Sequence, residues 1–174
     1  MASASMVIGQ YLIGLGSNRP HGRHGRPADV VRAAIEALGR QGLAIRRVSH
    51  VIRTPAMGPS DRDFANAAVL VESALAPPAL LTLLQRVEHG FGRRRYRRWG
   101  ARVLDLDILA WSGGGWVSRG LTIPHIGLAT RDFALDPAAG IAPGWRHARH
   151  NLTLRQLRAR LRKPRPVDHG PRTP

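Results

Sequence analysis

The chain has 174 residues and no cysteine, and its 27 basic and 11 acidic residues give a formal net charge of +16. This length suits one domain with a real hydrophobic core. The lack of cysteine excludes a disulfide framework and a cysteine–zinc site, and it fits a reducing compartment. The first nine residues have neither a basic start nor a long apolar run, so we expect no signal peptide, no membrane span and a cytoplasmic location.

Apolar periodicity predicts strands and helices in alternation along the chain. Strands are expected over residues 10–15, 43–52, 66–72 and 103–109, with shorter extended segments at 116–118 and 121–125. Helices are expected over residues 28–38, 79–89, 128–135 and 151–161. Residues 1–161 would then form a single domain. The Pro-rich, charged residues 162–174 would form a disordered tail.

The order of these elements is β-α-β-β-α-β followed by a hairpin, in which residues 116–118 return after the turn at 112–115. This order predicts an α+β fold, a ferredoxin-like αβα sandwich with a mainly antiparallel sheet. Short connections favour antiparallel neighbours in such a sheet. The functional motifs would collect at one rim of it.

Positive charge in this chain is almost entirely arginine, because Lys163 is the only lysine. Guanidinium groups favour planar partners such as phosphate and carboxylate, so nucleic acid, a nucleotide or an acidic surface would each suit the charge. Most of the arginines are scattered, which indicates a compositional bias. We assign function only to the few that lie beside carboxylates.

Two aspartates interrupt the apolar run in the expected strand at 103–109. Asp105 and Asp107 fall on one face of that strand, roughly 7 Å apart, and aspartate is depleted in strands. Carboxylates this close repel each other unless a cation lies between them. Mg²⁺ with phosphate oxygens would resolve the repulsion, and Arg98 and Arg102 suit phosphate. A solvated strand face with Asp–Arg pairs explains these residues about equally well.

A glycine motif, Gly-Leu-Gly-Ser-Asn at residues 14–18, follows the first strand. It resembles the start of a dinucleotide fingerprint, but Arg19 stands where the third glycine belongs. No Gly-Lys-Ser or Gly-Lys-Thr follows, so it is not a P-loop either. What remains is a glycine turn at the end of a strand.

Several motifs occur in this sequence, and their combination is informative. They are GLGSN at 14–18, RTPAMGP at 53–59, DFANAAV at 63–69, QRVE at 85–88, RWGARVLDLDI at 98–108, IPH at 123–125 and RDF at 131–133. In combination they resemble the 6-hydroxymethyl-7,8-dihydropterin pyrophosphokinase family of folate biosynthesis, over about residues 10–161. The resemblance implies transfer of the β,γ-diphosphate of ATP to the hydroxymethyl oxygen of the pterin, with release of AMP.

The resemblance also implies a role for particular residues. Asp105 and Asp107 would bind two Mg²⁺ ions, and Arg93 and Arg102 would be the catalytic arginines, with Arg98 as a helper. The implied pterin-binding residues are Thr54, Pro55, Met57, Phe64, Asn66 and Phe133. The implied ATP-binding residues are Gln85, Glu88, Arg95, Trp99, Ile108, His125 and Arg131. The two phenylalanines could also be explained by core packing. His125 could be an ordinary hydrogen-bonded turn histidine, and Arg131 could be a charge on a helix surface.

Some positions depart from the family pattern. Tyr96 stands where lysine is common, Ile126 where tyrosine is usual, and Gly120 where an ATP-contacting arginine is expected. The sequence Asp-Pro-Ala at 136–138 replaces an apolar residue, proline and leucine. These departures bear on ATP affinity and loop closure and leave the metal pair and the pterin residues in place.

The partners implied are therefore ATP and the pterin, bound by a monomer, with no membrane and no nucleic acid. Two other functions stay open at this point. The charge of +16 would suit a nucleic-acid-binding module, whose binding would fall steeply with salt and need no magnesium. A catalytically weakened paralogue that binds pterin or nucleotide as a partner protein is the other alternative.

Overall fold

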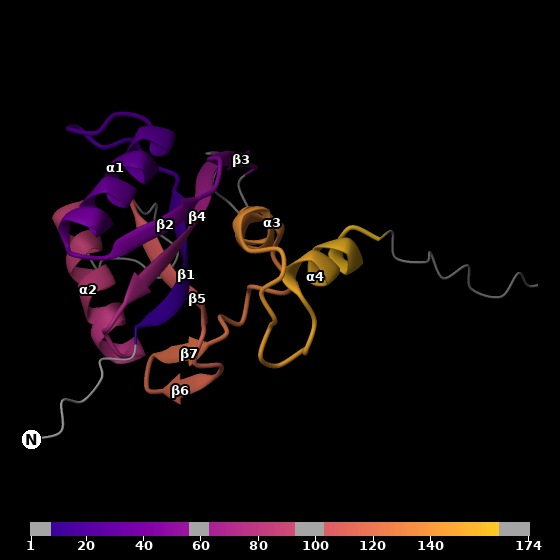
Figure 1. Cartoon of the computed structure of the whole chain (residues 1–174). Helices are drawn as coiled ribbons and strands as arrows, with labels where there is room; N and C mark the ends of the chain where they lie inside the picture. Colours follow the sequence, from indigo (N-terminus) through magenta and orange to yellow (C-terminus); the bar gives the residue numbers. More distant parts are fainter. Residues whose placement is uncertain (1–7, 56–62, 93–102, 164–174) are drawn as a thin grey trace, which may run out of the picture.

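The computed structural model describes residues 8–55, 63–92 and 103–163. The elements in chain order are β1 (Gly9–Ser17), α1 (Pro27–Arg40), β2 (Ala44–Val48), β3 (Ile52–Thr54), β4 (Phe64–Ser73), α2 (Pro77–Gly90), β5 (Asp105–Trp111), β6 (Trp116–Ser118), β7 (Leu121–Ile123), α3 (Asp132–Ile141) and α4 (Leu154–Leu161). Figure 1 shows α1 and α2 on one side of the main sheet and α3 on the other, with α4 beyond α3. The α+β sandwich is therefore confirmed.

The main sheet has the strand order β2-β4-β1-β5, and β3 pairs with β4 as well. Every strand pair is antiparallel. Helix α1 connects β1 to β2 and α2 connects β4 to β5, so each helix carries the chain across a neighbouring strand. This interleaving is that of a ferredoxin-like sheet, as predicted.

The two faces of the sheet bury separate apolar clusters. Ile13, Leu15 and Leu106 belong to the cluster under α1 and α2. Leu12 and Ala68 belong to the cluster that includes buried residues of α3 and α4. Because side chains alternate along a strand, neighbouring residues such as Leu12 and Ile13 enter opposite clusters.

The strand predicted over residues 43–52 is wrong in one respect, because it is two strands with a break at Ser49. The Ser49 N–H donates to the Ala68 carbonyl oxygen, and the Ser49 Oγ accepts the Ala68 N–H at 2.9 Å. The serine side chain thus takes the place of a backbone partner and lets the chain turn between β2 and β3. Such a contact with a distant strand leaves no trace in the local pattern.

The helix predicted over residues 128–135 is also shifted, since α3 runs from Asp132 to Ile141. A hydrogen-bonded turn precedes it, in which Arg131 N–H donates to the Gly127 carbonyl. Arg131 itself is extended, with φ −119° and ψ 117°. The helix continues through Pro137 because its buried residues, with Pro137 among them, pack against the sheet. This tertiary packing outweighs the lost hydrogen bond.

The last helix begins later than predicted, at Leu154 instead of residue 151. Asn151 has a φ of 50°, outside the helical region. Thr153 and Gln156 form a capping box in which each side chain accepts the other residue's backbone N–H. Of the predicted tail, only Arg162 and the following lysine lie within the described residues.

The strand that follows β5 pairs with a different strand from the one expected. Strand β6 pairs with β7 and not with β5, through a turn at Arg119 and Gly120. Gly120 has a φ of +80°, which a glycine adopts without strain. The turn therefore accounts for glycine at this position, where the family resemblance implied an arginine. None of the helices in the described ranges is long and apolar enough to cross a membrane.

His147 ties together the loop between α3 and α4, and only 3% of its surface is exposed. Its backbone N–H donates to the Leu152 carbonyl, and its Nδ1 accepts the Arg149 N–H. Burial, followed by the charges of His150 and Arg149, lowers the pKa of His147 below its ordinary value of 6.5. The folded chain therefore holds this ring neutral.

We expect acid to destabilise the fold through this ring. Below about pH 6.5 the unfolded chain binds a proton that folded His147 does not, so stability is complete above this pH and falls as the pH drops toward the folded pKa. Thermal melting between pH 8 and pH 5 should show a smaller loss for His147→Asn than for the wild type. His50→Asn, at an exposed position, is the control, and equal pH dependence in all three proteins would contradict the assignment.

Candidate active site

Four strands present a row of residues across one face of the main sheet. Asn66 of β4 lies opposite Ile52 of β3 and Gly16 of β1, and Gly16 in turn lies opposite Asp105 of β5. Residues opposite one another share a face, so the Asn66 amide and the Asp105 carboxylate flank Gly16 on the same side. This is the α3 face, because Ala68, two residues after Asn66, belongs to the cluster under α3.

Asp105 and Asp107 have the arrangement that the alternating pattern predicts. Both carboxylates are half-buried on the α3 face of β5, whereas Leu106 between them is buried in the opposite cluster. Their partners across the sheet are glycines, with Asp105 opposite Gly16 and Asp107 opposite Gly14. No strand side chain therefore stands between the carboxylates and β1.

The donor set fits magnesium that arrives with a nucleotide. Mg²⁺ is usually bound through one or two carboxylates, with substrate phosphates and water completing its shell. Within the described part of the chain, no group of three or more His, Cys, Asp or Glu residues could hold a metal by itself. Two carboxylates on one rigid strand match the first requirement without an all-protein cage.

Glu88 is the most deeply buried charged residue in the described ranges, with 2% of its surface exposed. Its Oε1 accepts the Leu106 N–H at 2.8 Å. Because β5 is an edge strand of the sheet, this contact from α2 satisfies a backbone donor on the strand's open side. It also fixes the residue between Asp105 and Asp107, which makes Glu88 a positioning residue for the pair.

We expect Glu88→Ala to lower the free energy of unfolding by about 1–3 kcal/mol, the cost of leaving a buried donor unsatisfied. Glu88→Gln keeps an acceptor oxygen and should recover most of that loss. Urea denaturation of both variants checks this prediction. Glu36→Ala, at an exposed position of α1, is the control. Normal stability with weakened ATP binding in both variants would contradict the positioning role.

Two of the predicted pterin-binding residues, Thr54 of β3 and Phe64 of β4, lie close to Asn66. The Asn66 Nδ2 donates to Thr54 Oγ1 at 2.8 Å, and Phe64 lies opposite Thr54 in the β3–β4 register. Phe133 is the second residue of α3. Both rings are half-buried, and neither belongs to the two apolar clusters of the described residues. This favours a site over core packing. Pro55 follows β3 and is exposed.

The predicted ATP-binding residues are more dispersed. Ile108 is buried in the cluster under α1 and α2, so its side chain faces away from the carboxylates. Gln85 is exposed on α2, and Arg131 is exposed with its guanidinium carbon 5.8 Å from the centre of the Phe133 ring. Met57, Arg93, Arg95, Arg98, Trp99 and Arg102 lie outside the described residues.

Two hydrogen bonds hold His125, one through its backbone and one through its ring. Its N–H donates to the Leu109 carbonyl of β5, and its Nδ1 accepts the Gly127 N–H at 3.1 Å. The neutral ring therefore carries its proton on Nε2, where it can donate to a phosphate oxygen. The next residue, Ile126, is 76% exposed.

The polar end of β1 was not among the predicted site residues. Ser17 and Asn18 are 1% and 4% exposed, although they follow the strand that was expected to end in a simple turn. Two small polar residues directly after a buried strand were the available signal. The residue Gly16 was likewise read as part of a turn, whereas it lies inside β1.

Together, the ferredoxin-like fold and this face define a class of α+β protein in which a carboxylate pair and an amide share one face of the sheet. The model of the family 7,8-dihydro-6-hydroxymethylpterin-pyrophosphokinase matches residues 12–143. A 2-amino-4-hydroxy-6-hydroxymethyldihydropteridine pyrophosphokinase of Synechocystis is 37% identical over 147 residues, covering 84% of this chain and 73% of that protein. The protein of the same name from Methylorubrum extorquens is 40% identical, covering 75% and 81%.

A solved structure of wild-type HPPK-DHPS from Plasmodium falciparum matches with a TM-score of 0.70 and 12% identity. The match covers 88% of this chain and 41% of that one, so the chain spans less than half of it. At this identity the likeness shows the fold alone.

The chain belongs to the 7,8-dihydro-6-hydroxymethylpterin-pyrophosphokinase family, as its motifs predict. It is an ATP-dependent diphosphotransferase of folate biosynthesis, the reaction of this family being pyrophosphate transfer from ATP to hydroxymethyldihydropterin.

Proposed function

We propose that the α3 face between Asn66 and Asp105 is where diphosphate passes from ATP to 6-hydroxymethyl-7,8-dihydropterin. The observation that carries this proposal is the register of the sheet, which puts an amide and a carboxylate pair on one face on either side of a glycine. The hydroxymethyl oxygen forms a bond to the β-phosphorus and its hydroxyl proton is released to water. The bond from that phosphorus to the α,β-bridging oxygen breaks, and AMP leaves.

The pterin would be read by its polar edge and its flat faces. Because Asn66 Nδ2 is engaged with Thr54, Asn66 Oδ1 is the atom available to accept an N–H of the pterin. Phe64 and Phe133 would stack on the two faces of the ring. Pro55 and Met57 would complete the pocket.

The nucleotide would bind beside the carboxylates. Magnesium, when bound with ATP, supplies positive charge that neutralises the phosphate oxygens. Asp105 and Asp107 would hold it, and Arg93 and Arg102 would stabilise charge on the transferring group. His125 would donate Nε2–H to phosphate, and Ile108 would act through its backbone. The remaining nucleotide contacts would come from Gln85, Arg95, Trp99 and Arg131.

We further infer two Mg²⁺ ions per nucleotide, a single domain over residues 1–161, and a monomer in the cytoplasm. The negative charge of the triphosphate, including the diphosphate that is transferred, is sufficient to bind two divalent ions. The monomer is supported by the origin of the site, since Asn66, Asp105 and Phe133 all come from one chain. The cytoplasm is supported by the absence of cysteine.

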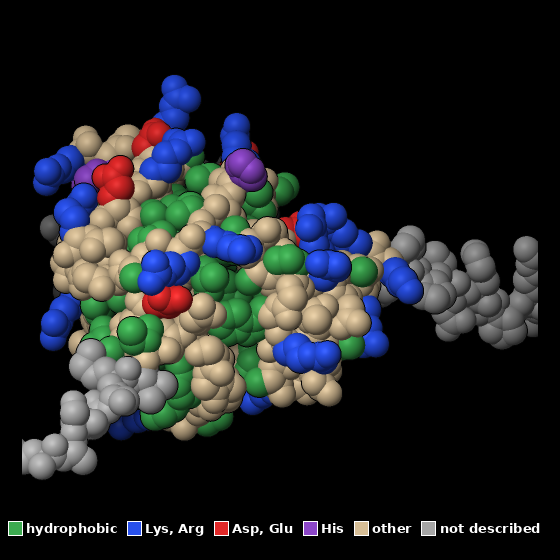
Figure 2. All heavy atoms as spheres, viewed as in Figure 1, with side chains coloured by type: hydrophobic (Ala, Val, Ile, Leu, Met, Phe, Trp, Pro, Cys, Tyr) green, Lys and Arg blue, Asp and Glu red, His purple; other side chains and the backbone are tan. Residues whose placement is uncertain are grey.

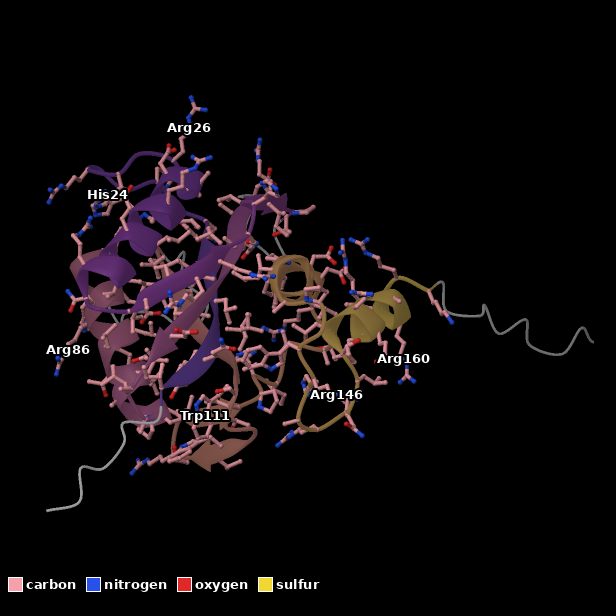
Figure 3. The ribbon with its side chains drawn as sticks, in the orientation of Figure 1. His24, Arg26, Arg86, Trp111, Arg146 and Arg160 are labelled. Carbon is pink, nitrogen blue, oxygen red and sulfur yellow. The ribbon has the colours of Figure 1, made fainter. Side chains whose placement is uncertain are left out.

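Nucleic-acid binding is less well supported. Figure 2 shows arginine and lysine side chains spread over the visible face of the molecule. In Figure 3, Arg26, Arg86, Arg146 and Arg160 project outward from separate parts of the fold. On this face, the described residues form no continuous basic stripe of the kind that tracks a phosphate backbone.

The test is to incubate the protein with ATP and 6-hydroxymethyl-7,8-dihydropterin, with and without Mg²⁺, and to separate the nucleotides. AMP that requires both the pterin and Mg²⁺ is expected. ADP as the product would overturn diphosphate transfer. No nucleotide product, together with tight salt-sensitive RNA binding, would favour the nucleic-acid module.

A further inference from the structure

Strand β1 contains two glycines, Gly14 and Gly16, in the middle of the sheet. Glycine weakens a strand interior and often marks a place where a ligand or another backbone approaches closely. Neither glycine has a positive φ, whereas five others in the described ranges do. Their backbone conformation is therefore open to any residue, and the reason for glycine must be the space above it.

At Gly14 the space is filled by the protein itself. A methyl group placed there would lie 3.2 Å from both Cδ atoms of Leu109. Leu109 is buried in the cluster under α3. Gly14 therefore makes room for a core side chain, and packing explains it fully.

At Gly16 the surroundings differ. A methyl group there would lie 3.2 Å from Asn66 Oδ1, and no other described side chain or distant backbone atom would come within 4 Å. Asn66 bounds this space on one side and Asp105 on the other. Among the described residues, nothing occupies the surface that the glycine leaves bare.

We propose that Gly16 is a specificity-determining residue that forms the floor of the pterin site, an inference that rests on the proposed function. Asn66 and Asp105 are two strand spacings apart, roughly 9–10 Å, which a two-ring pterin with its hydroxymethyl arm can span. The ring stands between Phe64 and Phe133, and the edge between its two ends lies over the bare backbone of Gly16. Its N–H edge meets Asn66 Oδ1 and its hydroxymethyl group points toward the carboxylates.

Any side chain at position 16 would then act on the pterin in two ways. It would lift the ring from the floor, and it would push the Asn66 oxygen, which is already at 3.2 Å from the added carbon. Nucleotide binding would be spared, because it depends on Asp105 and Asp107 on the neighbouring strand. Gly14→Ala is the matched control, since the three atoms nearest to its methyl group all belong to the core residue Leu109.

The experiment measures binding of 6-hydroxymethylpterin in the presence of Mg²⁺ and a non-hydrolysable ATP analogue. Gly16→Ala should raise the pterin Kd about tenfold or more, the scale of one added methylene in a fitted pocket, with unchanged analogue Kd and Tm. Gly14→Ala should lower the Tm and leave the pterin Kd unchanged. An unchanged pterin Kd in Gly16→Ala would overturn the proposal.

A second measurement uses the wild-type protein and needs no variant. With glycine labelled by ¹³C at Cα, pterin binding should move the Gly16 Hα signals through the ring current and leave Gly14 in place. Pterin binding that leaves the Gly16 Hα signals unchanged would contradict the proposal that Gly16 forms the floor of the site. If the wild type binds pterin but makes no AMP, the proposed function fails, and the Gly16 signals still report on the floor.

Discussion

Asp107→Ala is expected to lower the rate of AMP formation by about 10³-fold or more, the scale on which single charged groups act in phosphoryl transfer. The substitution removes one of two carboxylates that would hold magnesium with the triphosphate. The fold should remain, because Asp107 is half-buried on an open strand face and not part of either apolar cluster. Turnover by a coupled AMP assay and the Tm give the two readouts.

Asp29→Ala is the matched control for this variant. Asp29 is an acidic residue of α1 paired with Arg32 at 2.8 Å, and both side chains are largely exposed. Its loss should change turnover less than twofold, since exposed pairs contribute little. Wild-type turnover in Asp107→Ala would refute the assignment of the metal pair.

Arg102→Ala is expected to reduce kcat by about 10³-fold with a smaller effect on ATP binding, as for arginines that stabilise charge on a transferring phosphoryl group. Arg102→Lys should recover part of the rate, because it restores the charge without the planar guanidinium. Arg102 lies outside the described residues, and its role follows from the motif at 98–108. Arg160→Ala, at an exposed position of α4 (Figure 3), is the control for loss of a positive charge.

Single-turnover kinetics separate this effect from one on binding. A fall in kcat with unchanged ATP Kd is expected for a residue that acts on the transferring group. A raised ATP Kd with normal kcat would assign Arg102 to ground-state binding and contradict a catalytic role.

Much of the fold was predictable because its signals are local. The alternation around Asp105 and Asp107 predicted both the strand and the fact that the two carboxylates share one of its faces. Helical spacing predicted α1 and α2, although prolines extend both by a turn or less at the start. These patterns depend only on residues near one another in sequence.

The errors in the fold come from contacts between distant segments. Ser49 divides one predicted strand through hydrogen bonds to Ala68 of β4. Helix α3 passes through Pro137 because buried neighbours compensate for the missing backbone donor. Neither contact can be inferred from a short window of sequence, since local preferences yield to tertiary packing.

Motifs alone indicate the candidate site residues, and the arrangement of these residues does not follow from the motifs. Motifs identified Asn66 and Asp105 separately, and only the strand register shows that Gly16 lies between them. Glu88 stays a predicted ATP-binding residue from its motif, and the structure adds that its buried carboxylate accepts the Leu106 N–H. Register and burial are properties of the assembled sheet, so no single-sequence pattern contains them.

We expect the pterin over Gly16 and the metal–nucleotide at Asp105 and Asp107 to lie side by side on one face of the sheet. The most direct measurement is the paramagnetic broadening of bound 6-hydroxymethylpterin protons by Mn²⁺ in the presence of a non-hydrolysable ATP analogue. The hydroxymethyl protons should broaden most and the ring C7 proton less, and Asp107→Ala should remove the effect. A pterin that binds with none of its protons broadened would contradict the claim.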